Sequence, residues 1–476
     1  MPGLNTVGYP VYWGRFGNRP KQQPARRLVS IKNGRPSMFA EMRSGFLCTL
    51  FCTALFCTTL FCTTLIVSGA SPVSAAKPLR VYLGTYTGPA VTDAKGIYLT
   101  ELNPEDGTLA PPRLVAECAN PAFLALHPFK PLLYAVGEGG QGVVRAYSLD
   151  TKTGDLVFLN EETVPGEGAC HLCVCCSRED LPASVAVACY GSGTVHLLPI
   201  RDDGRLDPCS STIRHSGEGP NTRRQLGPHA HAVYHLPVAV TDKFVIEMLV
   251  AVDLGVDKVY HYLLDQEKKE IVDPDTDLGE DKRNDQIALP PGSGPRHLAQ
   301  QLTLDNDTDK TGHVMSDYTC YILNELDSTV CVYDGERILQ TLSTLPEGVQ
   351  PADCDNATAE VFLHPGGRFL YASNRGHDSI ALFTVAGKMV AGKTVDTNSL
   401  DTKNEKAPLT FVECVPSGGK HPRSFNLSPC GNWLIAANMN TNDVATFKID
   451  RTTGRLTPTG KRITVNRPVC VLPVRE

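Results

Sequence analysis

The sequence predicts an all-β fold, a seven-bladed propeller of four-stranded blades whose last blade is closed by the N- and C-terminal strands. Past Lys77 the chain consists of short β-rich runs broken by turn signals, with no long stretch of helical period. Turns at Gly107, Gly154 and Gly204 recur after 47 and 50 residues, which is the length of one blade. With 42% hydrophobic and 20% charged residues, the 476-residue chain has a globular composition.

A targeting segment precedes the repeats. Residues 46–67 are apolar throughout and follow Arg43, and Val73 and Ala75 occupy the −3 and −1 places of a small-residue cleavage site. We expect a start-site extension over residues 1–41, a signal peptide over residues 42–75, and a mature domain over 76–476 that is exported to the periplasm or the extracellular space. The apolar run could also span a bilayer, so an uncleaved membrane anchor remains an alternative. A cytoplasmic protein is expected only if this segment does not function.

The charge distribution excludes one class of partner. Residues 1–75 carry eight Lys or Arg and one acidic residue, Glu41, which leaves 37 basic and 50 acidic residues in the rest of the chain. A chain with that acidic excess and no basic stripe is not suited to bind nucleic acid. We expect no nucleic-acid partner and a monomeric mature protein.

Six internal units follow one another along the chain. In each, a strand ends in a turn, an apolar strand follows, and an alternating strand closes the unit. The strands from Phe123, Glu360 and Ser424 begin the longer units, and shorter ones follow three histidines, His171, His231 and His297. His127 and His364 lie in the His-Pro turns at equivalent places, so we interpret them as structural.

The two ends of the chain supply the seventh blade. Residues 81–109 lack an opening strand, whereas residues 467–474 form one strand with no blade after it. Joining them removes the sheet edge that an open array would expose. Six or eight blades remain alternative counts, since blade boundaries from one sequence vary by a few residues.

Polar residues at equivalent blade positions should meet at one mouth of the central channel. A ring of Arg, Glu and His side chains there predicts a site for a small anionic molecule, with Arg296 and Arg375 as carboxylate or phosphate clamps. Ion pairs of these two arginines with Glu325 are the structural alternative. The residues of the ring are His171, His229, His231, Arg296, His297, Asn324, Glu325, Asn374, Arg375, His421 and Arg423.

Several long motifs resemble the seven-bladed propeller lactonases, a family that includes bacterial 6-phosphogluconolactonases and fungal carboxymuconate-lactonizing enzymes. They include LGTYTG near the start, GPNTRRQLGPHAHAV (219–233), GPRH (294–297) and SNRGHDSI (373–380). The resemblance implies that His231, Glu325, Arg296 and Arg375 are catalytic. The other seven residues of the ring are then expected to bind substrate.

The expected reaction is hydrolysis of a lactone, 6-phosphogluconolactone or a related sugar lactone. It requires an activated water and charge stabilisation on the carbonyl oxygen, for which histidine and arginine are suited. We expect His231 to be the acid or base and Glu325 to orient it or share its proton, although alternation along a strand places His229 on the same face. A carboxymuconate cycloisomerase and a non-catalytic exported propeller that binds a ligand or a protein are the alternatives.

A cysteine-rich stretch raises the question of a metal. Alternation divides it into His171, Cys173 and Cys175 on one face and Cys170 and Cys176 on the other. Neighbours on one face lie roughly 6.6 Å apart along a strand, too far for tetrahedral zinc. We therefore expect no metal and no cofactor.

Overall fold

The computed structural model describes residues 77–90, 93–241, 245–273, 286–307, 312–386 and 408–474. The predicted extension and signal peptide, which end at residue 75, lie outside these residues. Within the described ranges, no helix has the length and apolar character needed to cross a membrane.

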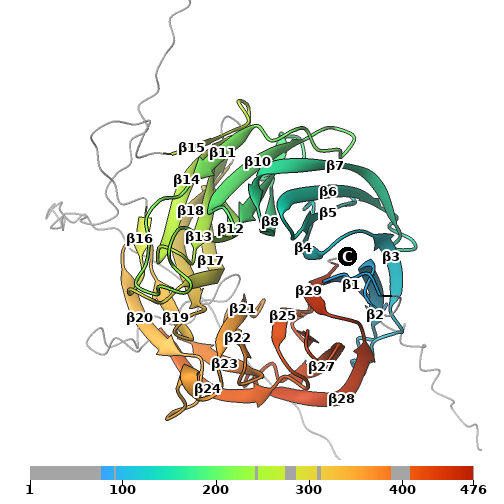
Figure 1. Cartoon of the computed structure of the whole chain (residues 1–476), viewed down its shortest axis with the longest axis vertical. Coiled ribbons are helices and arrows are strands. Elements are labelled where there is room, and N and C mark those ends of the chain that lie inside the picture. Colours follow the sequence, from blue (N-terminus) through green and yellow to red (C-terminus); the bar gives the residue numbers. More distant parts are fainter. Residues whose placement is uncertain are drawn as a thin grey trace, which may run out of the picture. The chain divides into compact units, whose positions relative to one another are not determined.

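Seven antiparallel blades surround a central channel, as predicted (Figure 1). The first blade, from its innermost strand outwards, is β29 (Pro468–Pro473), β1 (Leu79–Thr85), β2 (Gly96–Leu102) and β3 (Arg113–Glu117). The second and third blades are β4 (Pro121–Leu126), β5 (Leu132–Gly137), β6 (Gln141–Leu149) and β7 (Leu156–Glu167), then β8 (Ala169–Cys175), β9 (Ala183–Cys189), β10 (Thr194–Ile200) and β11 (Ser211–Arg214).

The fourth and fifth blades belong to one continuous sheet. Their innermost strands are β12 (Ala230–Thr241) and β17 (Pro295–Asp307), and the far ends of β12 and β18 pair directly, with Ala239 opposite Val314. The remaining strands of these blades are β13 (Val245–Asp253), β14 (Lys258–Asp265), β15 (Glu270–Val272) and β16 (Gln286–Ala288), then β18 (Gly312–Asn324), β19 (Thr329–Tyr333) and β20 (Ile338–Ser343).

The sixth and seventh blades follow a short 3₁₀ helix, η1 (Pro351–Asp353). Their strands are β21 (Ala357–Leu363), β22 (Phe369–Arg375), β23 (Ser379–Val385) and β24 (Leu409–Pro416), then β25 (Pro422–Leu427), β26 (Trp433–Asn438), β27 (Asp443–Ile449) and β28 (Leu456–Thr464).

The closing turns from which the repeat was recognised join neighbouring blades. The hydroxyl of Tyr82 donates to the carbonyl of Gly154 at 2.7 Å, and that of Tyr134 donates to Gly204 at 3.0 Å. Both glycines have positive φ, and a Cβ on Gly154 would lie 2.6 Å from Leu99. The spacing of the Gly turns in the sequence therefore matches the spacing of these contacts between blades.

The two turn histidines have the structural role that was predicted. Nδ1 of His127 accepts from the backbone N–H groups of Phe129 and Lys130. Nδ1 of His364 accepts from the N–H of Gly366, and its Nε2 bonds to the carbonyl of Gly431 in the next blade. Each ring therefore holds one turn closed at the end of an innermost strand.

Candidate functional site

Several side chains of the site come from a bulge that every innermost strand carries near its first residue. At this bulge the register with the second strand shifts, so at least one residue has no cross-strand partner and its side chain is re-aimed. We call the end of the channel where these strands begin the mouth. The residues without a partner are Ala122, Cys170, His231, Arg296, Ala359, Glu360, Arg423 and Val469.

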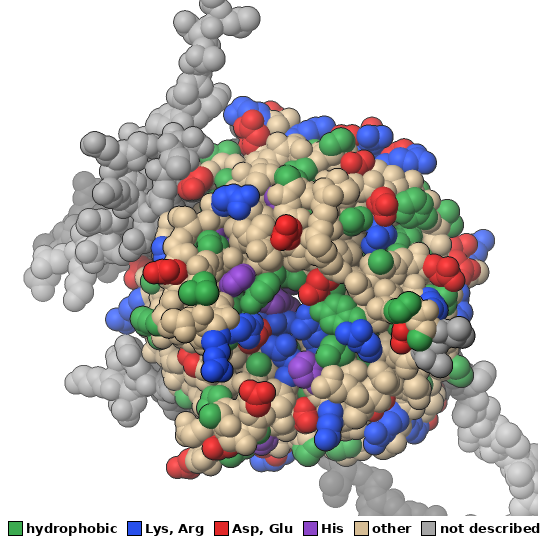
Figure 2. Space-filling view, viewed as in Figure 1, with side chains coloured by type: hydrophobic (Ala, Val, Ile, Leu, Met, Phe, Trp, Pro, Cys, Tyr) green, Lys and Arg blue, Asp and Glu red, His purple; other side chains and the backbone are tan. Residues whose placement is uncertain are grey.

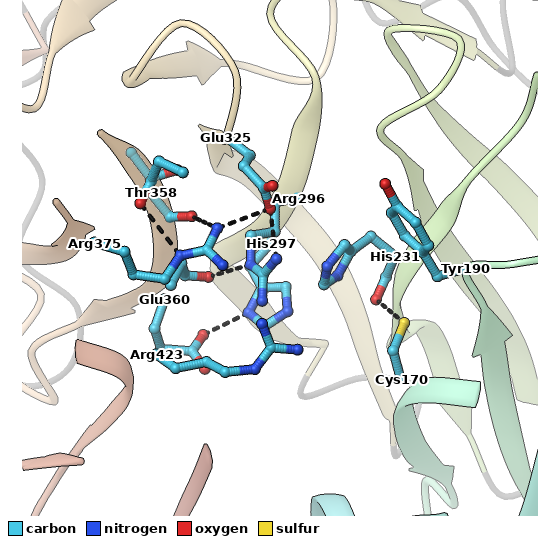
Figure 3. A network of polar contacts seen from close by, with 12 residues as sticks. Cys170, Tyr190, His231, Arg296, His297, Glu325, Thr358, Glu360, Arg375 and Arg423 are labelled. Atoms are coloured by element: carbon cyan, nitrogen blue, oxygen red, sulfur yellow. Dashed lines mark hydrogen bonds and ion pairs between the residues drawn. The ribbon is translucent and has the colours of Figure 1, made fainter. Parts of the chain in front are cut away.

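A carboxylate bound by three arginines lies at the mouth, and Figure 3 shows two of them, Arg296 and Arg375, beside Glu325. Oε1 of Glu325 accepts from Arg224 Nη2 at 2.7 Å, and Oε2 accepts from Arg296 Nη1 at 2.5 Å and lies 3.0 Å from Arg375 Nη2. Glu325 directly follows β18, and its own N–H donates to Gly294. The side chain of Glu325 is 4% exposed, so water contributes little to balancing these charges.

These contacts leave an excess of positive charge. Burial favours the neutral form of Glu325, but the guanidiniums of Arg375 and Arg296 outweigh it and hold the pKa of Glu325 well below its usual range. Burial lowers the pKa of Arg375 to about 9, so its guanidinium is still charged at pH 7. Figure 2 shows basic side chains gathered around a hollow at the centre of this face. The arrangement suits an anionic ligand.

The backbone fixes the direction of two of these arginines. Nε of Arg296 donates to the carbonyl of Ala359 at 2.9 Å. Arg375 donates from Nε to Ala357 and from Nη2 to Thr358, at 3.3 and 2.7 Å. Among the described residues, Nη2 of Arg296 and Nη1 of Arg375 have no protein acceptor, so these groups can bind a ligand.

His231 lies beside this cluster. The residue is 4% exposed, and its ring packs edge to face on His297 and Tyr190, with centroids 5.2 and 5.5 Å apart. Burial lowers the pKa of His231 well below its usual range, and the charge of Arg296 adds to the effect. Nδ1 of His231 is buried and makes no hydrogen bond within the described part of the chain. The imidazole of His231 is therefore neutral, and its buried Nδ1 is left without a protein partner beside the charged cluster.

His297 is held by Glu360, which the sequence marked only as the start of a repeat unit and not as a site residue. Nδ1 of His297 and Oε1 of Glu360 share a hydrogen bond of 2.7 Å, and both side chains are buried. Burial raises the pKa of Glu360 to about 8 and lowers that of His297 well below its usual range. At pH 7 the carboxyl is thus largely protonated, and a proton is shared between Oε1 of Glu360 and Nδ1 of His297. His171 packs on the same ring, with centroids 5.2 Å apart.

The mouth continues outwards from Arg423. Nη2 of this arginine donates to the hydroxyl of Tyr86 at 2.5 Å and lies 3.5 Å from a carboxylate oxygen of Glu138. The tyrosine hydroxyl donates to the same carboxylate at 2.5 Å. His421, one residue before β25, lies in the same field, since burial and the charges of Arg375 and Arg423 lower its pKa to about 4.

Two predicted substrate-binding residues point away from the channel. Asn324 and Asn374 are fully buried within their blades. Nδ2 of Asn324 donates to Thr329 Oγ1 at 2.8 Å, and Nδ2 of Asn374 donates to the carbonyl of Thr344 at 2.9 Å. These two asparagines therefore hold the chain in position immediately before Glu325 and Arg375 and do not line the channel.

The geometry distinguishes His229 from His231. The strand β12 starts at Ala230, so His229 precedes it, and the bulge at His231 breaks the alternation that was expected to place both on one face. His229 stacks on Tyr190 at 4.4 Å, and its Nδ1 bonds to the carbonyl of that tyrosine at 2.8 Å. One nitrogen of His229 is therefore occupied by the protein.

Glu325 does not orient His231 as expected. Both carboxylate oxygens are bound by guanidiniums, and no hydrogen bond joins the two residues in the described ranges. Charged guanidinium groups in fixed positions are stronger partners for a buried carboxylate than a neutral imidazole. Glu325 acts on His231 only through its charge.

Arg224 is another site residue that the sequence did not reveal. It lies in a long connection between β11 and β12 that is anchored by the buried Gln225, whose Nε2 donates to Leu254 and Asp257 at 2.8 Å. Arg224 also donates to the hydroxyl of Tyr190 at 3.1 Å. The available signal was the paired arginine within the motif at 219–233, but nothing local indicated which carboxylate it would reach.

The cysteine-rich strand forms no ligand cluster. Sγ of Cys170 donates to the carbonyl of His231 at 3.2 Å, and Sγ of Cys173 lies 3.9 Å from that of Cys175. In the ranges that the structure describes, no three His, Cys, Asp or Glu side chains are arranged to hold a metal ion.

Comparison with known proteins agrees with the fold. A family model described as "Lactonase, 7-bladed beta-propeller" matches residues 80–473. A 6-phosphogluconolactonase from Bacillus subtilis is 33% identical over 398 residues, which cover 82% of this chain and 97% of that relative. A second 6-phosphogluconolactonase, from Formosa agariphila, is 26% identical over 388 residues, covering 79% and 95% of the two chains.

A solved structure is similar over the same length. The periplasmic gluconolactonase of Pseudomonas aeruginosa superimposes with a TM-score of 0.65 at 26% identity, covering 84% of this chain and 99% of that one. The two kinds of relative are named for lactones with and without a phosphoryl group, so substrate has to be argued from the site.

Proposed function

This chain belongs to the seven-bladed β-propeller lactonases, and from that premise we propose that it hydrolyses a sugar lactone, 6-phosphogluconolactone or a close relative, to the open-chain acid. One observation carries the proposal. A neutral, buried histidine with an unused ring nitrogen, His231, lies next to arginines that a buried carboxylate holds together. Ester hydrolysis needs a proton acceptor beside fixed positive charge.

His231 is the group that we assign to water activation. Its neutral ring accepts a proton from water while the water oxygen bonds to the lactone carbonyl carbon. The free Nη groups of Arg296 and Arg375 then donate to the oxygen that becomes negative. Glu325 prevents the two guanidiniums from repelling each other, so they are in place before the reaction begins.

The ring oxygen that leaves as an alkoxide needs a proton in the second step. We assign the ring hydrogen of His297 to Nε2, with Nδ1 accepting from the protonated Glu360. When the carbon–oxygen bond of the ring breaks, Nε2 donates this proton and the carboxyl proton of Glu360 passes to Nδ1. His231 then gives the proton that it took from water back to the pair of His297 and Glu360. The acid and the base are thus both regenerated.

A panel of lactones tests the function. It should contain 6-phosphogluconolactone, gluconolactone and muconolactone, with acid release measured against the uncatalysed rate and the products identified by mass spectrometry. We expect addition of one water to a sugar lactone. Isomerisation of muconolactone without a gain of water would indicate a cycloisomerase instead, and turnover of none of the three would contradict the proposal.

Replacing Glu360 should change the pH profile of the reaction. Wild-type kcat should fall as the pH rises through about 8, because the pair of His297 and Glu360 then loses its proton. Glu360→Gln cannot titrate, so its kcat should be lower at pH 7 by about tenfold and should show no fall near pH 8. Initial rates from pH 6 to 9, corrected for spontaneous hydrolysis, measure this.

The same substitution should alter stability in a defined direction. A carboxyl whose pKa rises from 4.5 to about 8 on folding makes the protein less stable as the pH rises between these values, because the unfolded chain has already released the proton. The Tm of Glu360→Gln should therefore fall less than that of the wild type from pH 5 to 8. Glu161→Gln, on an exposed outer strand, is the control. In the kinetic experiment, a fall in kcat near pH 8 that persisted unchanged in Glu360→Gln would show that Glu360 has no part in the mechanism.

A further inference from the structure

Two arginines flank one tyrosine at the outer part of the mouth. The guanidinium carbons of Arg423 and Arg467 each lie 5.2 Å from the ring centroid of Tyr86. The N–H of Tyr86 donates to the carbonyl of Arg467 at 3.0 Å. Tyr86 directly follows β1 and Arg467 directly precedes β29, so this bond joins the two ends of the chain. Residues from the two ends of the chain thus place two guanidiniums against one aromatic ring.

The backbone at Arg467 is held in a conformation that its side chain does not favour. Its φ is 45°, in the left-handed region. Asn120, Gly168 and Gly294 have positive φ at the equivalent place, directly before an innermost strand, and glycine and asparagine adopt such angles at low cost. An arginine there is strained, and strained positions of this kind gather at ligand sites.

The charges in this outer part of the mouth are not balanced. Glu138 pairs with Arg423 and accepts from the hydroxyl of Tyr86. Within the described ranges, the guanidinium of Arg467 has no hydrogen bond or ion pair and contacts only the face of the ring. Two guanidiniums therefore face one carboxylate, and this excess adds to that of the three arginines around Glu325.

We propose that Arg423, Arg467 and Tyr86 form a subsite for the phosphoryl group of a phosphorylated sugar lactone, an inference that rests on the lactonase function proposed above. A phosphoryl group has three acceptor oxygens and about two negative charges, so it can bind two guanidiniums at once and balance the charge of both. Arg423 also acts electrostatically on His231 and Glu360, so the subsite is continuous with the reacting groups. The phosphoryl group would lie at the rim and the lactone carbonyl deeper in the channel.

The informative variant is Arg467→Asn, because asparagine tolerates the backbone angle at this position as Asn120 does in the second blade. We expect kcat/KM for 6-phosphogluconolactone to fall at least about tenfold, as for loss of one charge-assisted contact, with kcat/KM for gluconolactone unchanged. Arg451→Asn is the matched control. This exposed arginine follows β27 in the turn at the opposite end of the blade, and its loss should affect neither substrate.

A third substrate distinguishes a phosphoryl subsite from a general anion site. Glucarolactone carries a carboxylate in place of the phosphoryl group, so an equal loss with this substrate would overturn the phosphoryl assignment. An equal loss with gluconolactone, or no loss with any substrate, would overturn the subsite while leaving the lactonase function intact.

Calorimetric binding of the open-chain acids tests the subsite without catalysis. The wild type should bind 6-phosphogluconate more tightly than gluconate, and Arg467→Asn should weaken only the binding of 6-phosphogluconate. This result would support the subsite even if no lactone in the panel were hydrolysed. Equal affinity of the wild type for the two acids would contradict it.

Discussion

A chain that ends before Arg467 should be insoluble, or should unfold at a far lower temperature than the full protein. The deletion removes β29, the innermost strand of the first blade, which pairs with β1 from Val81 opposite Pro473 to Thr85 opposite Pro468. Its residues Val469 and Val471 are buried, and full burial of one such side chain contributes about 1.5–3 kcal/mol. Together with the lost strand hydrogen bonds, the deletion removes a large part of the 5–15 kcal/mol by which domains are usually stable.

The closure of the ring makes this effect larger than the loss of one edge strand would be. β29 also contacts the neighbouring blades, and Asn426 in β25 donates to the carbonyl of Val471 at 3.0 Å. Thermal melting and the soluble fraction after expression measure the result. A chain ending at Val474 keeps the strand and is the control. A melting curve unchanged by the longer deletion would contradict closure through β29.

His231→Ala should lower kcat by at least about 10²-fold, which is the usual contribution of a general acid or base. The fold should be preserved, because Nδ1 of this ring bonds to nothing in the described part of the chain and the ring is held by packing alone. Steady-state kinetics on the preferred lactone, with Tm measured alongside, separate an effect on turnover from an effect on stability.

His364→Gln is the matched control for that experiment. It replaces another buried histidine, which joins two blades through the carbonyl of Gly431, so it should lower Tm and leave kcat near the wild-type value. His229→Ala reports on the alternative base. Near-normal rates in both His231→Ala and His229→Ala would remove the proposed mechanism.

The fold could be predicted because its signals are local and repeated. Each blade has its own apolar strands, and several end in a Gly turn. Gly154 and Gly204 show in the structure why the period is strict, since each accepts from a tyrosine of the preceding blade. Even the unusual joining of the chain ends could be inferred, because a fragment without a first strand and a strand without a blade complete each other.

The candidate site was predictable as a set of residue types at equivalent blade positions, but not as a set of contacts. His231, Arg296 and Arg423 occupy bulges, and a bulge depends on pairing with the next strand rather than on the local sequence. Asn324 and Asn374 are also polar, and each directly precedes a residue of the charged cluster, Glu325 or Arg375. The pleat of their strands nevertheless points both side chains into the blades.

By itself, the sequence determined the all-β class, the blade period, the closure by both ends and the kinds of side chain that gather at the mouth, because each follows from patterns within a few residues or from their repetition. Only the tertiary structure decided the partners. Arg224 reaches Glu325 across 101 residues, and His297 reaches Glu360 across 63. Such pairs form because ring closure brings separate blades to one axis, and burial there sets which groups are charged.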